Sequence, residues 1–399
     1  MKTQLERVYT VDLVIDGLIV ASQYLIARFL FSDARPRLPK PAFRLILGAL
    51  CMVWIIVATG ISLNVVRTHP SWLRVPLEGG AWVSAIEILW GFTSAIAVGL
   101  YMVFRTILRS MPIPHSPSRR RMIQATAAVA VSAPVAAVAF GGLIERTSFR
   151  VREIDFPISN LHPDLEGFTI AQVSDLHVSP YLSVREAARV VDMANELKPR
   201  LAVMTGDLIS EKGDPLDATI AEIGRLRADL GVLGCMGNHE IYAECEDYTE
   251  LQSRRQGVDF LRLKARRIRW GGGELNFAGI DYQPFRNRAR YLLGADKLVV
   301  PGVPNILLSH NPDVFPVAAK QGYQAVIAGH THGGQVTVEI LRQTLNVVRF
   351  ATPYVAGFYR QGGREDGASC YVTAGIGTIG MPVRLGAPPE ITLLRLRRA

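Results

Sequence analysis

The segment YQAVIAGHTHGGQ, residues 323–335, joins a short apolar run to a turn with two histidines and three glycines. A run of this length that is bounded by turn residues is typical of a buried strand. His330 and His332 then stand where the strand ends. Histidines two residues apart are either polar rim residues or metal ligands, and the other apolar runs of the chain decide between the two.

Four further apolar runs also end in polar residues of the kinds that bind metals. They are FTIAQVSDLH (168–177), RLAVMTGDL (200–208), GVLGCMGNHE (231–240) and PNILLSHNPD (304–313). Two segments with helical spacing of their apolar residues, 184–198 and 217–230, separate the first three runs. This alternation predicts an α/β fold with a parallel sheet, and in such sheets ligands bind beyond the carboxyl ends of the strands.

Five of the eight histidines of the chain stand at these strand ends. Each polar residue alone has a structural interpretation: Asp as a helix N-cap, Asn as a turn residue, His as a rim residue. Their repeated occurrence at strand ends indicates a metal centre instead. The candidate residues are Asp175, His177, Asp207, Asn238, His239, His310, His330 and His332.

The order Asp-x-His, Gly-Asp, Gly-Asn-His-Glu, Ser-His and Gly-His-Thr-His resembles the calcineurin-like metallophosphoesterases over roughly residues 150–399. The motif GHTHGGQ and the tail GIGTIGMPVRLGAPPEITLL, residues 375–394, are similar to a membrane-attached bacterial subgroup of that family. The resemblance implies a four-layer α/β-β/α sandwich and two divalent metal ions. It implies that one ion is bound by Asp175, His177, Asp207 and His332, and the other by Asp207, Asn238, His310 and His330.

The resemblance also implies that His239 faces the substrate as a catalytic residue and binds no metal. Carboxylate, amide and imidazole ligands without thiolate suit Mn, Fe or Zn and do not select among them. Two such ions, about 3.5–4 Å apart, clamp a phosphate oxygen and activate a water for in-line attack on phosphorus. His239 would give a proton or a charged hydrogen bond to the leaving oxygen.

The expected function is therefore metal-dependent hydrolysis of phosphodiester or pyrophosphate bonds, in lipid-linked or envelope substrates. Two alternatives stay open. One is a phosphoprotein or phosphomonoester phosphatase with the same metal chemistry. The other is a non-catalytic membrane receptor or transporter whose outer domain only binds a ligand.

The first 145 residues hold most of the apolar excess of a chain that is 49% hydrophobic. Three runs of about 20 residues, the length that the hydrocarbon core of a bilayer requires, predict transmembrane helices at 45–65, 82–104 and 122–143. A fourth run, 8–31, contains Asp12 and Asp16. It is either a span or an interfacial start to a shorter helix, and we favour the second interpretation.

Loop charge predicts the orientation of these spans. The loops 32–44 and 105–121 are richer in Lys and Arg than the loop 66–81, which places the two richer loops in the cytoplasm and everything after residue 145 outside. SRRRMIQ, residues 118–124, is either a twin-arginine export signal or three cytoplasmic arginines before a span. AVA at 137–139 resembles a signal-peptidase site, although we favour retention as an anchor. The expected location is the bacterial cell membrane, with the catalytic domain outside the cytoplasm.

These patterns predict three regions. Residues 1–145 form a membrane region with three to four helices, 146–167 a short linker that leads into the domain, and 168–399 the metallophosphoesterase domain. The net charge of +9 lies largely beside the apolar runs, so no nucleic-acid partner is expected. The basic segment 285–293, FRNRARYLL, is either a grip for lipid phosphates or an exposed helix. Cys235 and Cys245 are candidates for a disulfide in an exported protein.

Overall fold

The computed structural model describes residues 117–340, 343–361 and 367–399, together with scattered positions before residue 107. By its contacts the chain divides into two compact units, Met1–Phe140 and Gly141–Ala399. The second unit contains all eight candidate residues.

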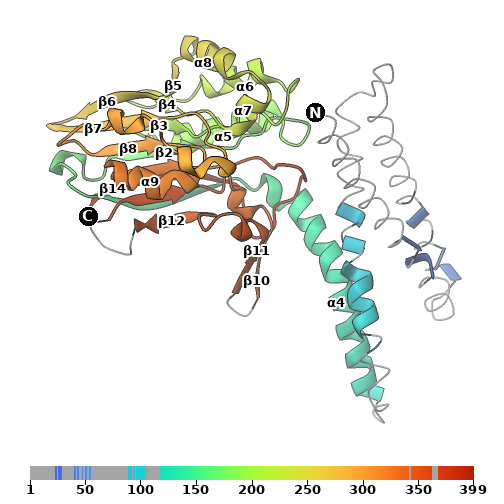
Figure 1. Cartoon of the computed structure of the whole chain (residues 1–399). Helices are drawn as coiled ribbons and strands as arrows, with labels where there is room; N and C mark the ends of the chain where they lie inside the picture. Colours follow the sequence, from blue (N-terminus) through green and yellow to red (C-terminus); the bar gives the residue numbers. More distant parts are fainter. Residues whose placement is uncertain are drawn as a thin grey trace. The chain divides into compact units, whose positions relative to one another are not determined.

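Two six-stranded sheets form the second unit, with the strand orders β1-β14-β2-β3-β4-β5 and β12-β13-β9-β8-β7-β6 (Figure 1). The strands of the first sheet are β1 Arg150–Ile158, β2 Thr169–Val173, β3 Leu201–Met204, β4 Val232–Gly234, β5 Val258–Phe260 and β14 Glu390–Arg398. Those of the second are β6 Lys264–Trp270, β7 Gly273–Gly279, β8 Asn305–Leu308, β9 Ala325–Ala328, β12 Gly357–Arg360 and β13 Ser369–Val372. Strands β2 to β5 run parallel, as do β7, β8, β9 and β13, so each sheet has a parallel centre.

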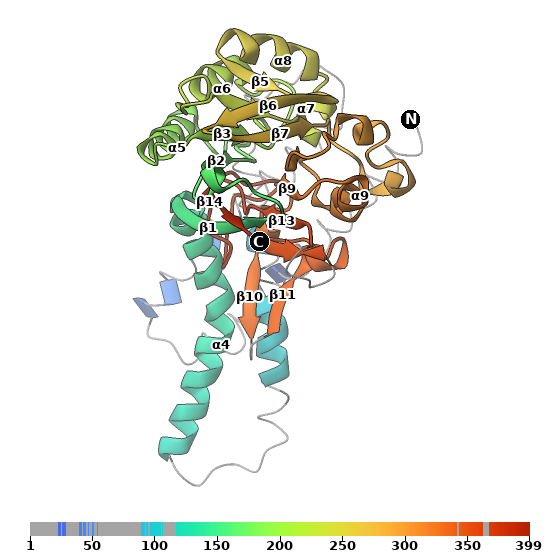
Figure 2. The ribbon, with the colours of Figure 1, turned by 90° about the vertical axis from the view of Figure 1, so that its left-hand side faces the viewer.

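Helices cover the outer face of each sheet. Their bounds are α5 Val184–Glu196, α6 Leu216–Ile223, α7 Asn238–Tyr242, α8 Glu246–Arg255 and α9 Phe315–Gln321. Figure 2 shows α5 and α6 beside the first sheet and α9 beside the second. Helix α5 begins with a capping box, in which the Ser183 side chain accepts from the Glu186 N–H and the Glu186 carboxylate accepts from the Ser183 N–H.

The alternation of side chains along each strand explains why the sheets pack as inner layers. On β3, Leu201 and Val203 enter the core between the two sheets, whereas Ala202 and Met204 enter the core under α5 and α6. Strand β8 repeats the pattern on the other side, where Leu307 points toward α9. Each central strand therefore buries both faces, which is typical of parallel sheets covered by helices. The predicted four-layer α/β-β/α arrangement is confirmed.

The region 146–167, which the sequence predicts to be a linker, contains strand β1. It pairs in parallel with β14 at the edge of the first sheet, from Arg150 opposite Glu390 to Ile158 opposite Arg398. Phe156 and Ile158 are fully buried between the sheets. The chain therefore joins the catalytic fold about 20 residues before the first motif, and the other predicted region boundaries stay predictions.

Most of the predicted spans at 8–31, 45–65 and 82–104 lie outside the described residues. The run 122–143 forms the greater part of helix α4, Pro117–Leu143, but a span there is not supported. Within the described part of the chain, no helix is sufficiently long and apolar to cross a membrane. The predicted orientation stays a prediction.

Candidate metal centre

Loops from both sheets converge at the carboxyl ends of the parallel strands. Strands β2, β3 and β4 of the first sheet are followed by Asp175 and His177, by Asp207, and by Asn238 and His239. Strands β8 and β9 of the second sheet are followed by the remaining three histidines, His310, His330 and His332. The structure brings all eight candidate residues together, and we call them the ligand cluster.

The first group of the ligand cluster consists of Asp175, His177 and His332. Its ligand atoms lie within 4.8 Å of one another. His332 Nε2 is 3.4 Å from Asp175 Oδ1 and 3.1 Å from His177 Nε2. All three side chains are almost completely buried.

The second group consists of Asn238, His310 and His330. His310 Nε2 is 3.1 Å from Asn238 Oδ1 and 3.1 Å from His330 Nδ1. The Asp207 carboxylate lies between the groups, because its Oδ2 is 3.3 Å from His177 Nε2 of the first group and 3.0 Å from His310 Nε2 of the second. The geometry therefore matches two adjacent centres that share one carboxylate.

The outer ring nitrogens show which way the imidazoles face. His310 Nδ1 meets the Thr205 carbonyl at 2.6 Å, and His332 Nδ1 meets the Gly377 carbonyl at 3.3 Å. A carbonyl only accepts, so the Thr205 carbonyl assigns a proton to His310 Nδ1 and turns Nε2 toward Asp207, whereas His332 Nδ1 lies between the Gly377 carbonyl and an N–H of Arg384 3.3 Å away. The Nε2 atoms of His332 and His177 face each other at 3.1 Å, so either a proton or a metal ion lies between them, and the donor set fits divalent metals.

The charge balance of the ligand cluster leads to the same conclusion. Burial alone would raise the pKa of the Asp207 carboxyl, but His310 and His177 hold it well below its usual range. Burial and the adjacent His310 lower the pKa of His330 to about 3. Burial would also lower the pKa of His310, yet Asp207 raises it to about 9. The carboxylate thus draws positive charge onto a ring beside it, and a bound cation would take the place of that proton.

Backbone strain is concentrated in the ligand cluster. Left-handed φ angles occur at Asp175 (53°), His177 (47°), Asp207 (57°), His330 (77°) and His332 (52°). Each such residue costs on the order of 1–3 kcal/mol and persists where the surrounding structure imposes it, typically at functional sites. Five of the eight candidate residues therefore have a strained backbone conformation.

Two glycines make room for the carboxylates. A Cβ on Gly237 would lie 2.1 Å from Asp207 Oδ1, and a Cβ on Gly329 would lie 2.4 Å from Asp175 Oδ2. Both distances are far inside van der Waals contact. The glycines of the GNHE and GHTHGGQ motifs thus allow loops of different strands to touch the ligand carboxylates.

Glu240 is a fully buried carboxylate that the sequence analysis left without a role. It accepts hydrogen bonds from the backbone N–H groups of Gly237 (2.8 Å), Asp207 (3.0 Å) and Leu208 (2.7 Å). It therefore fixes the loop after β3 to the loop after β4. Burial, and then Asp207, raise the pKa of Glu240. The signal in the sequence was its place directly after Asn-His, at the start of a helix.

Arg384 was also missed, although the quoted tail motif contains it. It is fully buried, and its guanidinium donates to the backbone carbonyls of Gly377, Ala374 and Ala387. The same Gly377 carbonyl lies 3.3 Å from His332 Nδ1, so Arg384 and His332 contact one carbonyl. Burial lowers the pKa of Arg384 to about 10, so the side chain is charged at neutral pH. A lone arginine in an apolar, glycine-rich tail was the signal in the sequence.

His239 and two tyrosines line the remaining side of the ligand cluster. The backbone N–H of His239 donates to Asp207 Oδ1 at 2.9 Å. The ring Nδ1 of His239 contacts the Ser210 carbonyl. One ligand atom of His239 also lies within 4.8 Å of ligand atoms of His177 and Asp207, so geometry alone does not separate it from the metal ligands. Burial lowers the pKa of His239. Tyr282 faces His330, with ring centroids 5.2 Å apart, and Tyr242 faces His239 at 5.8 Å.

Other features that the sequence singled out do not join the ligand cluster. The segment 285–293 begins with a short 3-10 helix, Phe285–Arg290, which agrees with the exposed-helix interpretation, and its Arg288 pairs with Asp313. Cys235 and Cys245 are both free, so they form no disulfide.

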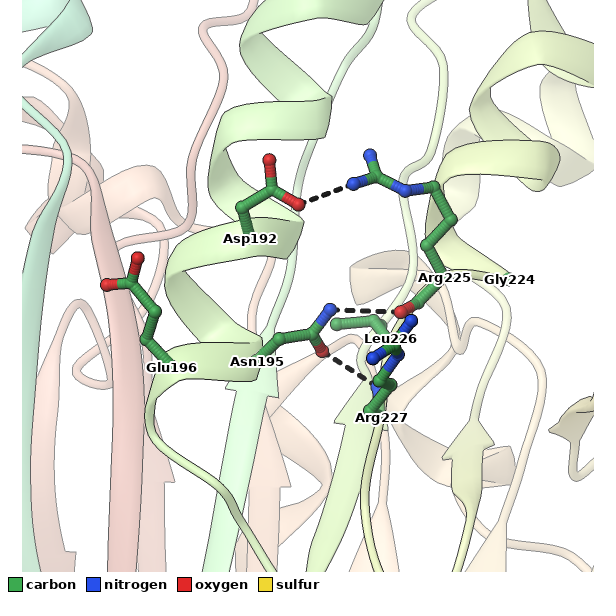
Figure 3. Close-up of a pocket in the computed structure, with 7 residues that line it drawn as sticks. All are labelled: Asp192, Asn195, Glu196, Gly224, Arg225, Leu226 and Arg227. Carbon is green, nitrogen blue, oxygen red and sulfur yellow. Dashed lines mark hydrogen bonds and ion pairs between the residues drawn. The ribbon is translucent and has the colours of Figure 1, made fainter.

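A surface hollow of about 560 Å³ lies between α5 and α6. Figure 3 shows the Asn195 side chain hydrogen-bonded to the backbone of Arg225 and Arg227 at this hollow. No residue that lines the hollow belongs to the ligand cluster.

Comparison with known proteins gives the same family as the sequence motifs. The family model for calcineurin-like phosphoesterases matches residues 168–334. A Danio rerio protein named transmembrane protein with metallophosphoesterase domain is 27% identical and aligns over 96% of this chain and 87% of its own length. The Bos taurus protein of that name is 30% identical over 62% of this chain and 57% of its own length.

A metallophosphoesterase of Aquifex aeolicus is 30% identical over 57% of this chain and 84% of its own length. The alignment therefore covers most of the length of this relative. The bacterial membrane-attached subgroup stays a prediction. The chain belongs to the calcineurin-like metallophosphoesterase family.

Proposed function

We propose that the chain hydrolyses phosphodiester or pyrophosphate bonds with two divalent metal ions, and that its substrates are lipid-linked. The observation that carries the hydrolase proposal is the Asp207 carboxylate, which lies 3.3 Å from a histidine of one group and 3.0 Å from a histidine of the other. When bound, such ions neutralise phosphate charge and supply an activated water. We assign one ion to Asp175, His177, Asp207 and His332, and the other to Asp207, Asn238, His310 and His330.

The residues around the ions would position the substrate. His239 is the candidate acid, because its Nδ1 is held by the Ser210 carbonyl and its Nε2 is left for the substrate. A phosphate anion beside this ring favours a proton on Nε2, which the ring can then give to the leaving oxygen. Tyr282 is largely buried and closes the side of His330 away from bulk water.

A second candidate function is phosphomonoester or phosphoprotein hydrolysis, which uses the same ligand cluster. The complete ligand cluster favours either hydrolase over a receptor that only binds a ligand, because two metal ions that share a carboxylate supply an activated water, which turnover requires and ligand binding does not. Turnover would distinguish these functions. The full chain, purified in detergent and loaded with Mn, is assayed on nitrophenyl phosphate, bis-nitrophenyl phosphate and a lipid pyrophosphate.

We expect the diester and the lipid pyrophosphate to be hydrolysed faster than the monoester. Activity on monoesters and phosphopeptides alone would replace the proposal by the phosphatase alternative. No turnover of any ester by Mn-loaded protein would revive the receptor alternative.

We also propose that the part of the chain before Gly141 attaches it to a membrane, with the catalytic unit outside the cytoplasm. Two relatives are named transmembrane proteins, and the apolar runs 45–65 and 82–104 have the length of a span. A reporter that is active only outside the cytoplasm, fused after Ala399, should be active. The chain should also stay with the membranes in alkaline carbonate. Release by carbonate, or an inactive reporter, would refute the attachment or the orientation respectively.

The twin-arginine interpretation has a separate test. Replacing Arg119 and Arg120 by Lys should stop export if these residues form a twin-arginine signal. Unchanged export would leave them as positively charged residues that only set orientation.

A further inference from the structure

An amphipathic hairpin projects from the second unit, directly after the GHTHGGQ motif. It consists of β10 Thr337–Ile340 and β11 Gln343–Asn346 (Figure 2). Val338 pairs with Leu345, whereas Thr337 pairs with Asn346. Because side chains alternate along a strand, Val338 and Leu345 share one face. Val347 begins the short helix that follows β11.

The polar face of the hairpin is fastened to the ligand cluster. The Asn346 side chain, which is buried, donates to the Gly333 carbonyl at 2.9 Å and to Thr337 Oγ1 at 2.7 Å. Its Oδ1 accepts from the Val348 N–H at 2.9 Å. Gly333 directly follows His332. The root of the hairpin is thus held rigidly against the turn that carries two candidate ligands.

The apolar face, in contrast, is open to solvent. Leu345 is 56% exposed and Val347 is 79% exposed, and Phe350 in the short helix that follows is 94% exposed. A two-stranded hairpin is marginally stable in water, and several large apolar side chains exposed within one short segment indicate an interaction site. The hairpin therefore lacks a partner for this face among the described residues.

The hairpin and the turn after it carry a small positive charge. Residues 337–350 contain two arginines, at 342 and 349, and one acidic residue, Glu339. Arg349 lies between the exposed Val347 and Phe350 and is itself exposed. Apolar side chains that are interspersed with arginines suit the interface of an anionic bilayer, where lipid phosphates attract the guanidinium groups.

The point where the chain enters the second unit lies at the same root. Gly141 is the first residue of this unit, and its carbonyl accepts from the Arg384 N–H at 3.2 Å. The neighbouring Leu385 is bonded through its carbonyl to the Thr337 N–H at 2.7 Å. Arg384 and Leu385 thus connect the hairpin to Gly141. The chain before Gly141 contains the apolar runs.

We propose that the β10–β11 hairpin and the turn Val347–Phe350 dock the catalytic unit on the surface of a lipid bilayer. The apolar face enters the interface, and Asn346 transmits this position to the turn of His332. The inference rests on the proposed function in one respect, since it explains how a lipid-linked phosphate reaches the ligand cluster. It names a bilayer as the partner, and it requires no span by the hairpin itself.

A fluorescent label at the hairpin tests the docking without any assay of activity. The full chain with Cys51→Ser and Cys245→Ser leaves only the buried Cys235 and Cys370. Phe350→Cys in this background is labelled with a nitrobenzoxadiazole dye, and Leu263→Cys, at another exposed apolar position (53%), serves as the matched control. Both proteins are reconstituted in phosphatidylcholine–phosphatidylglycerol vesicles with and without lipids that carry a doxyl quencher on the acyl chain.

The doxyl lipid should quench the label at 350 and leave the label at 263 unquenched. Equal behaviour of the two labels would overturn the proposal. A label at 350 that is shielded from water but not reached by doxyl lipid would also overturn it, because the face would then be covered by protein, either the N-terminal region or a second copy.

A second experiment connects docking to turnover. The double variant Val347→Glu and Phe350→Glu should hydrolyse a diester embedded in vesicles at least about tenfold more slowly, because each apolar side chain kept out of lipid costs a tenfold or more in binding. Hydrolysis of soluble bis-nitrophenyl phosphate should stay unchanged. Equal loss on both substrates would refute the docking role. If neither substrate is hydrolysed by wild type, the proposed function fails, whereas the label experiment still decides the docking.

Discussion

The two groups of the ligand cluster rest on buried charges of opposite sign. Beneath the first group, the Arg384 guanidinium donates to three backbone carbonyls and shares one of them with His332. Beneath the second, the Glu240 carboxylate accepts three backbone N–H groups and fixes the loops of Asp207 and Asn238. In each case backbone dipoles solvate a buried ion. Each group therefore has its own support, and only Asp207 belongs to both.

This comparison predicts the largest effect for the shared residue. Asp207→Asn should lower kcat on a diester by about 10³-fold or more, because several kcal/mol of charge stabilisation are lost at both groups. Circular dichroism should show the fold retained. Asp192→Asn, a carboxylate on the surface of α5 that pairs with Arg225, is the matched control and should keep wild-type kcat. Near-normal turnover by Asp207→Asn would mean that the two groups do not share a carboxylate.

Two adjacent residues sharpen the boundary between ligand and catalyst. Asn238→Ala should weaken metal binding at the second group. His239→Ala should keep both metals and slow hydrolysis of alkyl diesters by about 10²–10⁴-fold, the usual contribution of general acid catalysis.

Nitrophenyl diesters should lose much less in His239→Ala, since nitrophenolate leaves without a proton. The rates of both variants are measured on both substrates at saturating Mn, together with metal content. Equal loss on the two substrates would leave His239 as a group that only orients phosphate. Loss of metal from His239→Ala would place it among the ligands.

Arg384→Lys tests the support of the first group. The substitution keeps the charge but loses the planar guanidinium that reaches several carbonyls. We expect the free energy of unfolding to fall by roughly 3 kcal/mol, because a buried carbonyl loses its charged donor. Metal content should fall at the first group and stay normal at the second. Arg225→Lys on the surface is the control. A variant with unchanged melting temperature and full metal content would show that Arg384 does not support His332.

Glu240→Gln is the matching test of the second group, with the smallest expected effect. The amide keeps the shape of the side chain but presents a donor to backbone N–H groups, so we expect a loss of about 1–3 kcal/mol. Metal at the second group should bind more weakly, and the first group, which shares only Asp207 with it, should be weakened less. If thermal unfolding and metal titration show both groups weakened equally, the separate supports proposed here are wrong.

The sequence predicts the ligand cluster better than its supports, for a physical reason. Strand ends are marked locally, because an apolar run must stop where the chain leaves the core, and polar residues there stand out. All eight candidate residues were found in this way, and the structure brings them together. Arg384 bonds carbonyls of its own tail, but its role at the site depends on its contact with His332, 52 residues away in sequence. No local pattern reports such contacts.

The same limit explains why the sequence did not predict strand β1. Strand β1 pairs in parallel with β14, about 240 residues away, and an edge strand with polar residues on one face looks like a linker in sequence. The hairpin β10–β11 was hidden by its short strands.

The number of metal ions per chain tests the central claim most directly. The full-length protein is loaded with Mn, freed of excess metal by gel filtration and analysed by inductively coupled plasma mass spectrometry beside Asp207→Asn. We predict two ions per wild-type chain and less than one per Asp207→Asn chain. One ion or none in wild type, or two tightly bound ions in Asp207→Asn, would contradict a dinuclear centre bridged by Asp207.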